Sequence, residues 1–388
     1  MRLRPFEPDP GHTGEGIVLG PTGSGVASDQ GLNVRIGRII YPLALVLVLA
    51  ACNGDDASET TPNGGSDAPD TLTILSHDSF AGGVSEGTFT AFTEETGITV
   101  EAIGAGDAGG AVNQAILTAD NPIADVLFGI DNTFLSRALE EDIFVPYESE
   151  FLDVIDPRLL VDDQNRVTPI DYGDVCLNYD IAWFEENELE PPQTLNDLVQ
   201  PEYDGLLVVE DPARSSPGLA FLLATIDHYG SEWQGYWESL VANNVGIAPD
   251  WETAYYTDFS HYGGDYPIVV SYASSPPAEV IFADPPVETA PTGVVTDGCY
   301  RQIEFAGILE GTEYPEAAGQ LIDFMLSPEL QETIPTSWFV FPANTEVELP
   351  EVFTENTVIP EDPVSMDYEE IAENRETWLD QWRQLVES

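Results

Sequence analysis

The fold is decided by residues 124–141, which read Ala-Asp-Val-Leu-Phe-Gly-Ile-Asp-Asn-Thr-Phe-Leu-Ser-Arg-Ala-Leu-Glu-Glu. Residues 124–130 form an apolar run with the length and composition of a buried strand, and residues 133–141 follow with helical spacing. Asp131 and Asn132 stand between the two, where the carboxyl end of the strand meets a loop. This segment predicts a strand, a polar loop and a helix in succession.

The same alternation extends outward from this segment in both directions. Further strands are predicted at 71–76, 98–103, 206–209 and 266–271, and further helices at 85–96, 111–119, 218–228 and 315–326. Strands that alternate with helices predict an α/β fold with mostly parallel sheets.

Ligands in such folds bind beyond the carboxyl ends of the strands. In this chain those ends are the loops at 76–80, 104–110 and 131–132 in an early lobe, and at 211–218 and 271–276 in a later lobe. A ligand is therefore expected in a cleft between two lobes.

Acidic side chains dominate the composition. The 388 residues include 70 acidic and 11 basic side chains, all of the latter Arg, for a formal net charge of −59. Such a surface repels phosphate backbones, which excludes nucleic-acid binding through counterion release. A hydrophobic share of 43% is enough for packed cores, and the length allows two domains. The four His residues lack metal-ligand spacing, so we expect neither a zinc site nor another cofactor.

A lipoprotein signal peptide is predicted at residues 34–52. Arg35 and Arg38 precede a largely apolar run at 39–51, which is shorter than the ~20 residues of a membrane-spanning helix. The run ends Leu-Ala-Ala-Cys52 and resembles the bacterial lipobox, so we expect Cys52 to carry a lipid and to begin the mature chain. An ordinary signal peptide with a chance cysteine is the alternative.

The segments on either side of this leader are expected to be an upstream extension and a tether. Residues 1–33 precede a leader of normal length, so we interpret them as an upstream extension and expect the true start near Val34. Residues 53–70 consist mainly of Gly, Asp, Ser, Thr and Pro, a composition typical of a flexible tether. The pattern predicts a folded body that is tethered outside the cytoplasm.

Two cysteines remain beyond Cys52. Cys176 and Cys299 make one even pair in an oxidising compartment, which favours a disulfide. Two buried free thiols are the alternative.

Polar loop residues are the candidates for ligand contact. Ser215 and Ser216 directly precede a predicted helix, where serines cap the first turn and the free N–H groups bind anions such as phosphate. Capping without a ligand is the alternative. Three acidic residues lie in loops of the early lobe: Asp78, Asp107 and Asp131. Each alone is typical of a turn, whereas the three together would favour a cation if they converge.

Aromatic residues suggest two kinds of ligand. Trp251 and the pair Tyr255-Tyr256 lie in a predicted loop-to-helix transition. Either they belong to the core, or they stack on a flat or cationic ligand, which would stabilise the bound ligand by ~0.5–2 kcal/mol per ring. Paired tyrosinates also ligate ferric iron in some solute-binding proteins. The letters Gly-x-Ser-x-Gly occur at 83–87, but not directly between a predicted strand and a predicted helix, as a nucleophile elbow requires, so the sequence does not predict an enzyme.

Nine segments, in this order, resemble the thiamine-binding lipoproteins and periplasmic proteins of thiamine ABC importers: 72–80, 124–132, 168–173, 211–219, 251–255, 270–276, 326–331, 334–338 and 373–382. The resemblance implies a type II periplasmic binding protein, with two α/β lobes of mostly parallel sheets joined by hinge strands at 168–178 and 299–305. The lobes it implies are 71–171 with 302–342, and 172–301 with 343–388. Cys176 and Cys299 would then lie on neighbouring hinge strands.

The resemblance also implies contacts from both lobes to the ligand. Ser215 and Ser216 would face its hydroxyethyl or phosphate end, Trp251 would pack against its ring, and Tyr272 would form a second wall. The binding set predicted in this way is Asp78, Ser79, Asp107, Ala108, Asp131, Asn132, Ser215, Ser216, Trp251, Tyr255, Tyr272 and Ser274. The chain departs from the family at Val84 and Ala278, where the relatives often carry aromatic rings.

The function predicted from these patterns is a lipid-anchored, extracytoplasmic receptor that works as a monomer. It would capture thiamine or a thiamine phosphate and deliver it to the permease of an ABC importer. One alternative is a ferric-iron receptor that uses Tyr255 and Tyr256. The other is a thiaminase-like transferase with Cys176 as nucleophile, which a Cys176–Cys299 disulfide would exclude.

Overall fold

The computed structural model describes residues 68–85 and 87–387, which belong to one unit at Gly65–Ser388. The predicted leader, the lipidated Cys52 and most of the tether fall on residues 1–67 and lie outside the described residues. Within the described ranges, no helix combines the length and the apolar character needed to cross a membrane.

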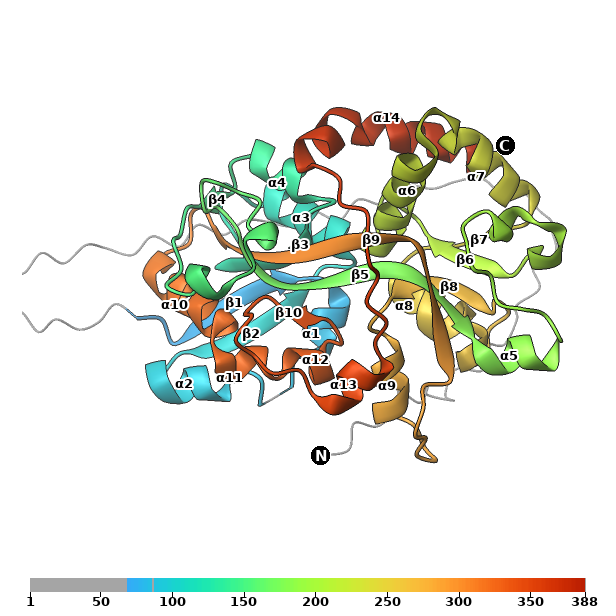
Figure 1. Cartoon of the computed structure of the whole chain (residues 1–388). Helices are drawn as coiled ribbons and strands as arrows, with labels where there is room; N and C mark the ends of the chain where they lie inside the picture. Colours follow the sequence, from blue (N-terminus) through green and yellow to red (C-terminus); the bar gives the residue numbers. More distant parts are fainter. Residues whose placement is uncertain (1–67, 86, 388) are drawn as a thin grey trace, which may run out of the picture. The chain divides into compact units, whose positions relative to one another are not determined.

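Strands from the whole described chain join one mixed sheet, in the order β2-β1-β3-β9-β5-β8-β6-β7 (Figure 1). Pairing is parallel at both ends, where β1 lies between β2 and β3 and where β6 lies between β7 and β8. In the middle, the long strands β5 and β9 run antiparallel to each other and to their outer neighbours. The parallel pairing expected from the sequence is therefore confined to the two ends of the sheet. The strands are β1 (Thr71–Ser76), β2 (Thr99–Gly104), β3 (Val126–Asp131), β4 (Phe144–Val145), β5 (Thr168–Asp180), β6 (Leu207–Glu210), β7 (Gly246–Ala248), β8 (Ile268–Tyr272), β9 (Thr292–Leu309) and β10 (Phe341–Pro342).

The two middle strands connect the two ends of the sheet. β5 and β9 pair from Thr168 opposite Ala306 to Asp180 opposite Thr292, so both strands are longer than the predicted crossings at 168–178 and 299–305. Figure 1 shows β1, β2 and β3 at one end of this pair and β6, β7 and β8 at the other. We call these ends, with their helices, the first lobe and the second lobe.

Helices pack against the sheet in both lobes, and a large apolar core contains residues of both. A second, smaller apolar cluster involves β6, β7 and β8. The predicted helix at 315–326 has the bounds of α10, whereas α3 begins at Ala108 because Asp107 caps its first turn. The predicted helix at 85–96 begins only at Thr90, after a turn in which the Thr88 amide donates to the Ser85 carbonyl. The helices are α1 (Asp78–Gly83), α2 (Thr90–Thr96), α3 (Ala108–Leu117), α4 (Leu135–Glu140), α5 (Ile181–Glu186), α6 (Ser216–Tyr229), α7 (Trp233–Ala242), α8 (Trp251–Thr253), α9 (Pro276–Ile281), α10 (Pro315–Leu326), α11 (Pro328–Gln331), α12 (Ile334–Ser337), α13 (Glu351–Asn356) and α14 (Tyr368–Val386).

The C-terminal helix α14 lies against both lobes (Figure 1). The guanidinium of Arg375 lies 4.7 Å above the ring of Phe134, which precedes α4 in the first lobe. Trp382 packs edge-on against Trp237 of α7 in the second lobe, with the ring centroids 5.7 Å apart. The segment 343–388 was predicted to belong to the second lobe alone, but its last helix spans the two.

Candidate functional site

Three carboxyl groups lie in a row across the middle of the sheet. Glu304 on β9 stands opposite Asp131 at the end of β3 and opposite Asp171 on β5. Residues directly opposite each other on antiparallel strands point to the same face of the sheet. Asp131 and Asp171 are fully buried, so this face carries a row of carboxyl groups with little access to water.

His77, just beyond β1, lies next to this row. Its Nε2 is 3.4 Å from Oε1 of Glu304, and its Nδ1 accepts a hydrogen bond from the amide of Phe80. The ring passes directly over Gly129, where an added Cβ would lie 2.3 Å from the His77 Cδ2 atom. Gly129 also has φ +81°, so only glycine fits this bulge without displacing His77.

Burial and neighbouring charges perturb the titration of these groups. Burial raises the pKa of Asp131 to about 6, and burial together with Glu304 raises the pKa of Asp171 well above its usual range. Burial opposes ionisation of Glu304, but the His77 hydrogen bond and charge hold its pKa below the usual value. Glu304 correspondingly raises the pKa of His77, against the effect of burial. Because Nδ1 accepts the Phe80 amide hydrogen, the ring proton lies on Nε2 and faces Glu304, so the arrangement favours an ionised Glu304 beside a protonated Asp171.

The N-terminus of α6 brings the second lobe to this cluster. Ser215 caps the helix through its Oγ, which accepts a hydrogen bond of 3.4 Å from the amide of Gly218. The preceding carbonyl of Arg214 accepts a hydrogen bond of 3.3 Å from the amide of Gly109 on α3 of the first lobe. A Cβ at Gly109 would lie only 2.9 Å from that carbonyl oxygen, so glycine allows the two backbones to meet.

Side chains from the two lobes also face each other at this contact. Burial raises the pKa of Asp107 and of Asp131, and the hydroxyls of Ser215 and Ser216, which face these two carboxylates, oppose that rise. Ser216 Oγ is buried, and neither it nor Oδ2 of Asp107 or of Asp131 has a hydrogen-bond partner of normal geometry among the described residues. Buried polar atoms are normally hydrogen-bonded, so this group is prepared for a further partner.

An aromatic wall from the second lobe extends the cluster. Trp251 donates a hydrogen bond of 3.0 Å from Nε1 to Ser271 Oγ, and its ring is partly exposed. Tyr272 lies edge-on to Trp251, with the ring centroids 6.4 Å apart, and donates from its hydroxyl to Oε1 of Gln302 on β9. Gln302 and Glu304 are two residues apart on one strand and so share a face. We call His77, Asp107, Asp131, Asp171, Ser215, Ser216, Trp251, Tyr272, Gln302 and Glu304 the central polar cluster.

Tyr255 lies behind this wall and not in it. It is buried, and its ring stacks on Trp251 with the centroids 5.2 Å apart and the planes inclined by 20°. Its hydroxyl donates a hydrogen bond of 2.7 Å to Oε1 of Glu279. The structure thus gives Tyr255 the role of fixing the orientation of Trp251, where a direct ligand contact was predicted.

The two tyrosines of the iron alternative lie in different surroundings, since Tyr255 is buried and Tyr256 is half-exposed. Burial raises the pKa of Tyr255 well above the usual range and that of Tyr256 to about 12, so both phenols keep their protons in the absence of a bound cation. Among the described residues, no group of three or more His, Cys, Asp or Glu side chains could hold a metal ion.

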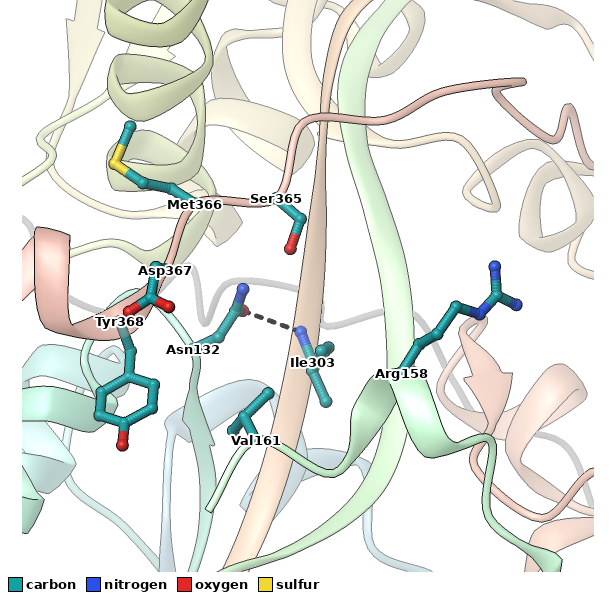
Figure 2. A pocket seen from close by; sticks show the side chains of 8 residues that line it. All are labelled: Asn132, Arg158, Val161, Ile303, Ser365, Met366, Asp367 and Tyr368. Atoms are coloured by element: carbon teal, nitrogen blue, oxygen red, sulfur yellow. Dashed lines mark hydrogen bonds between the residues drawn. The ribbon is translucent and has the colours of Figure 1, made fainter. Parts of the chain in front are cut away.

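Asn132 points away from the predicted ligand. Its Nδ2 donates a hydrogen bond of 3.0 Å to the carbonyl of Arg301. Its Oδ1 accepts a hydrogen bond of 3.0 Å from the amide of Ile303 (Figure 2). Asn132 and Ile303 also line a pocket of about 330 Å³, with Arg158, Val161, Ser365, Met366, Asp367 and Tyr368. Since neighbouring residues of a strand point to opposite faces, Ile303 places this pocket on the face opposite Gln302 and Glu304. The amide of Asn132 therefore clamps a hinge strand and is not part of the central polar cluster.

The remaining predicted residues lie around the cluster. Asp78 Oδ1 accepts a hydrogen bond of 3.0 Å from the amide of Gly106, and Ser79 Oγ lies 2.8 Å from His77 Nδ1. Ala108 is buried at the start of α3. Ser274 is fully buried between β8 and α9, and its Oγ has no hydrogen-bond partner among the described residues.

Four members of the cluster were not predicted from the sequence: His77, Asp171, Gln302 and Glu304. One signal was present, because Asp171 lies within a run predicted as a crossing strand, where an acidic residue is out of place unless it serves a site. His77 stands in a loop at the carboxyl end of the first strand, the position that ligand-binding residues share in such folds.

Cys176 and Cys299 form a disulfide between β5 and β9. Both are buried beside Ala273. A disulfide sulfur is not a thiolate nucleophile, so the thiaminase-like alternative loses its catalytic residue.

Comparisons with known proteins agree with this geometry. The family model for bacterial extracellular solute-binding proteins matches residues 121–373. The chain is 28% identical to the thiamine-binding periplasmic protein of Escherichia coli (strain K12), over 81% of this chain and 93% of that protein. Among solved structures, a periplasmic thiamin binding protein superimposes with a TM-score of 0.72 and 26% identity, over 81% of this chain and 96% of the other. Iron-bound HitA from Pseudomonas aeruginosa, at 22% identity, 82% and 99% coverage and a TM-score of 0.67, shares the fold.

Proposed function

The chain belongs to the family of bacterial extracellular solute-binding proteins, and we propose that it captures thiamine or a thiamine phosphate for an ABC importer. The relatives named above as thiamine-binding span nearly the whole described chain. This family consists of solute-binding transport proteins, so the proposal assigns capture and delivery, without catalysis.

The observation that carries the proposal is the central polar cluster, in which Trp251 is linked through Tyr272 and Gln302 to a row of buried carboxyl groups. Thiamine is a flat heterocycle with a permanent positive charge. An aromatic face attracts such a cation with about 0.5–2 kcal/mol, more when water is excluded. Ionised Asp131 and Glu304 supply the opposite charge, and the fixed Trp251 ring supplies a flat surface.

Movement of the lobes about β5 and β9 supports capture. The contact between Gly109 and Arg214 joins the first lobe to the second at the central polar cluster. Rotation about the two hinge strands would break this contact and open the site to solvent, as in hinge closure of other two-lobed receptors. We infer that ligand binding favours the state in which the contact is made.

The leader pattern supports an anchored receptor outside the cytoplasm. Cys52 would carry the lipid, residues 53–70 would tether the body, and a monomer would present the ligand to a membrane permease. Labelling of the expressed protein with radioactive palmitate tests the anchor. Label that is lost in Cys52→Ala supports it, and label that persists in that variant contradicts it.

Titration calorimetry of the purified protein with thiamine tests the ligand. We expect binding, and we expect Trp251→Ala to weaken it more than about tenfold, or roughly 1.4 kcal/mol. Trp183→Ala is a matched control, because Trp183 is also a partly exposed tryptophan but lies on α5, beyond the far end of β5. Equal affinities in the two variants would remove Trp251 from the binding site, and absence of binding in the wild type would contradict the proposed ligand.

A further inference from the structure

The two lobes meet at a second place, through a pair of phenylalanine rings. Phe282 directly follows α9 of the second lobe, and Phe339 comes two residues after α12 of the first lobe. The ring centroids lie 5.6 Å apart and the planes are inclined by 72°, which is an edge-to-face arrangement that aromatic rings favour. The closed lobes are therefore joined by this pair as well as by the backbone contact at Gly109.

The backbone at Phe339 is strained. Its φ of +58° lies in the left-handed region, where glycine or asparagine usually ends a helix and where a bulky side chain is unfavourable. The neighbouring Trp338 packs against Phe80 of α1 and Phe128 of β3, with ring centroids 5.1 and 5.6 Å away, and so fixes this segment to the first lobe. Strain of this kind persists where the residue has a use, and here it directs the Phe339 ring toward the second lobe.

Phe282 is exposed although its side chain is large and apolar. Its exposed fraction is 62%. Within residues 68–85 and 87–387, the apolar clusters of the core include neither Phe282 nor Phe339. Packing in the core therefore does not account for either ring, whereas contact between the lobes accounts for both.

Both rings are connected to the aromatic wall of the central polar cluster. α9 is preceded by Ser275, whose Oγ accepts a hydrogen bond of 3.2 Å from the amide of Tyr272. From the first lobe, Val340 follows Phe339 and lies beside Tyr272, since a Cβ at Gly173 would lie within 3.4 Å of both side chains. The six residues of α9 extend about 9 Å, so Phe282 lies at the edge of the site and not in it.

We propose that Phe282 and Phe339 form an aromatic latch, which makes contact when the lobes close over the ligand and slows release of the ligand. Rotation about β5 and β9 would separate the two rings and expose both to water. The latch acts on the closed state, so its removal should speed dissociation and leave association almost unchanged. The inference rests on the proposed function and adds the residues that keep the lobes closed.

Stopped-flow fluorescence of the purified full chain with thiamine tests the latch. Phe282→Ala and Phe339→Gly should each raise the dissociation rate constant at least threefold, whereas the association rate constant should change less than twofold. The double variant should release thiamine no more than twofold faster than either single variant, because each substitution alone removes the contact. Two matched controls should release thiamine at the wild-type rate: Leu117→Ala, which truncates an apolar side chain that is 85% exposed, and Asn244→Gly, which replaces another residue with positive φ.

Thermal unfolding separates a latch from an ordinary packing contact. Phe339→Gly relieves the backbone strain, so its midpoint should lie within 3 °C of that of the wild type. A lower midpoint together with an unchanged release rate would make the pair a structural contact and overturn the latch.

The remaining outcomes separate the latch from the proposed function. Unchanged release in both single variants, with normal binding by the wild type, would contradict the latch alone. Effects that multiply in the double variant would show that the two rings act separately, which would also overturn it. A wild type that binds no thiamine would contradict the proposed function, and the latch would fail with it.

Discussion

Removal of the Cys176–Cys299 disulfide should lower the stability of the protein by about 5 kcal/mol. The two cysteines are 123 residues apart in the sequence, so the bond closes a long loop in the unfolded chain. For a loop of this length, the chain-entropy model gives about 5 kcal/mol at 25 °C. The body that unfolds has about 320 residues, for which the unfolding entropy is roughly 0.7 kcal/mol per kelvin, so the midpoint should fall by about 7 °C.

Thermal unfolding followed by circular dichroism measures this effect in the double variant Cys176→Ala/Cys299→Ala. The single variant Cys299→Ala should lose about as much stability, because the bond and not the second sulfur makes the difference. A reducing agent should lower the midpoint of the wild type and leave that of the double variant unchanged. Thiamine affinity should change less than threefold, because both cysteines pack with Ala273 in a small apolar cluster of their own.

A wild-type midpoint within 2 °C of that of the double variant would refute the reasoning. Either loss of the bond would then not increase the conformational entropy of the unfolded chain as predicted, or the two sulfurs would not be bonded in the protein.

Four further substitutions test the site and the hinge. Asn132→Ala should lower the free energy of unfolding in urea by about 2–4 kcal/mol, because it removes the partner of two backbone groups of β9. A decrease below 0.5 kcal/mol would show that Asn132 does not hold β9 in place. Burial raises the pKa of Asp131 to about 6, so the contribution of Asp131 to the stability of the wild type falls as pH rises from 4 to 6. Asp131→Asn should therefore be more stable than the wild type by about 1–3 kcal/mol at pH 7.5 and no more stable at pH 4, and a difference that does not depend on pH would contradict this. Gly109→Val should weaken thiamine binding at least tenfold in calorimetry, because its Cβ would collide with the Arg214 carbonyl when the two lobes are in contact. An unchanged affinity would show that binding does not require this contact between the lobes. Tyr255→Phe should keep thiamine affinity within threefold, and the wild type mixed with ferric citrate should show no visible tyrosinate band; appearance of a band would revive the iron alternative.

The local elements could be predicted because each depends on neighbouring residues. The first strand, at 71–76, and the helix at 315–326 have the predicted bounds, since alternating or helical apolar spacing and the flanking loop residues define them. The helix at 85–96 was predicted too long because the apolar spacing of its later part was extended back through a turn that a side-chain hydrogen bond stabilises.

The row of carboxyl groups could not be predicted, because it depends on strand register between distant segments. Asp171 and Glu304 are opposite each other only because β5 and β9 pair with two irregularities along their length. In a chain with 70 acidic residues, no pair of carboxylates stands out from the sequence. The close approach of the His77 ring to Gly129 could not be predicted either, since it joins segments that are far apart in the sequence.

The last helix, α14, supplies contacts to both lobes. This helix is the last element of the described chain, and its buried face touches both Phe134 and Trp237. Neither lobe therefore has all its contacts until the final residues have left the ribosome or the export channel. A chain that is cut before Tyr368 would expose apolar surface on both lobes at once, where proteases and chaperones recognise incomplete proteins. The last helix thus makes the survival of the receptor depend on synthesis of its full length.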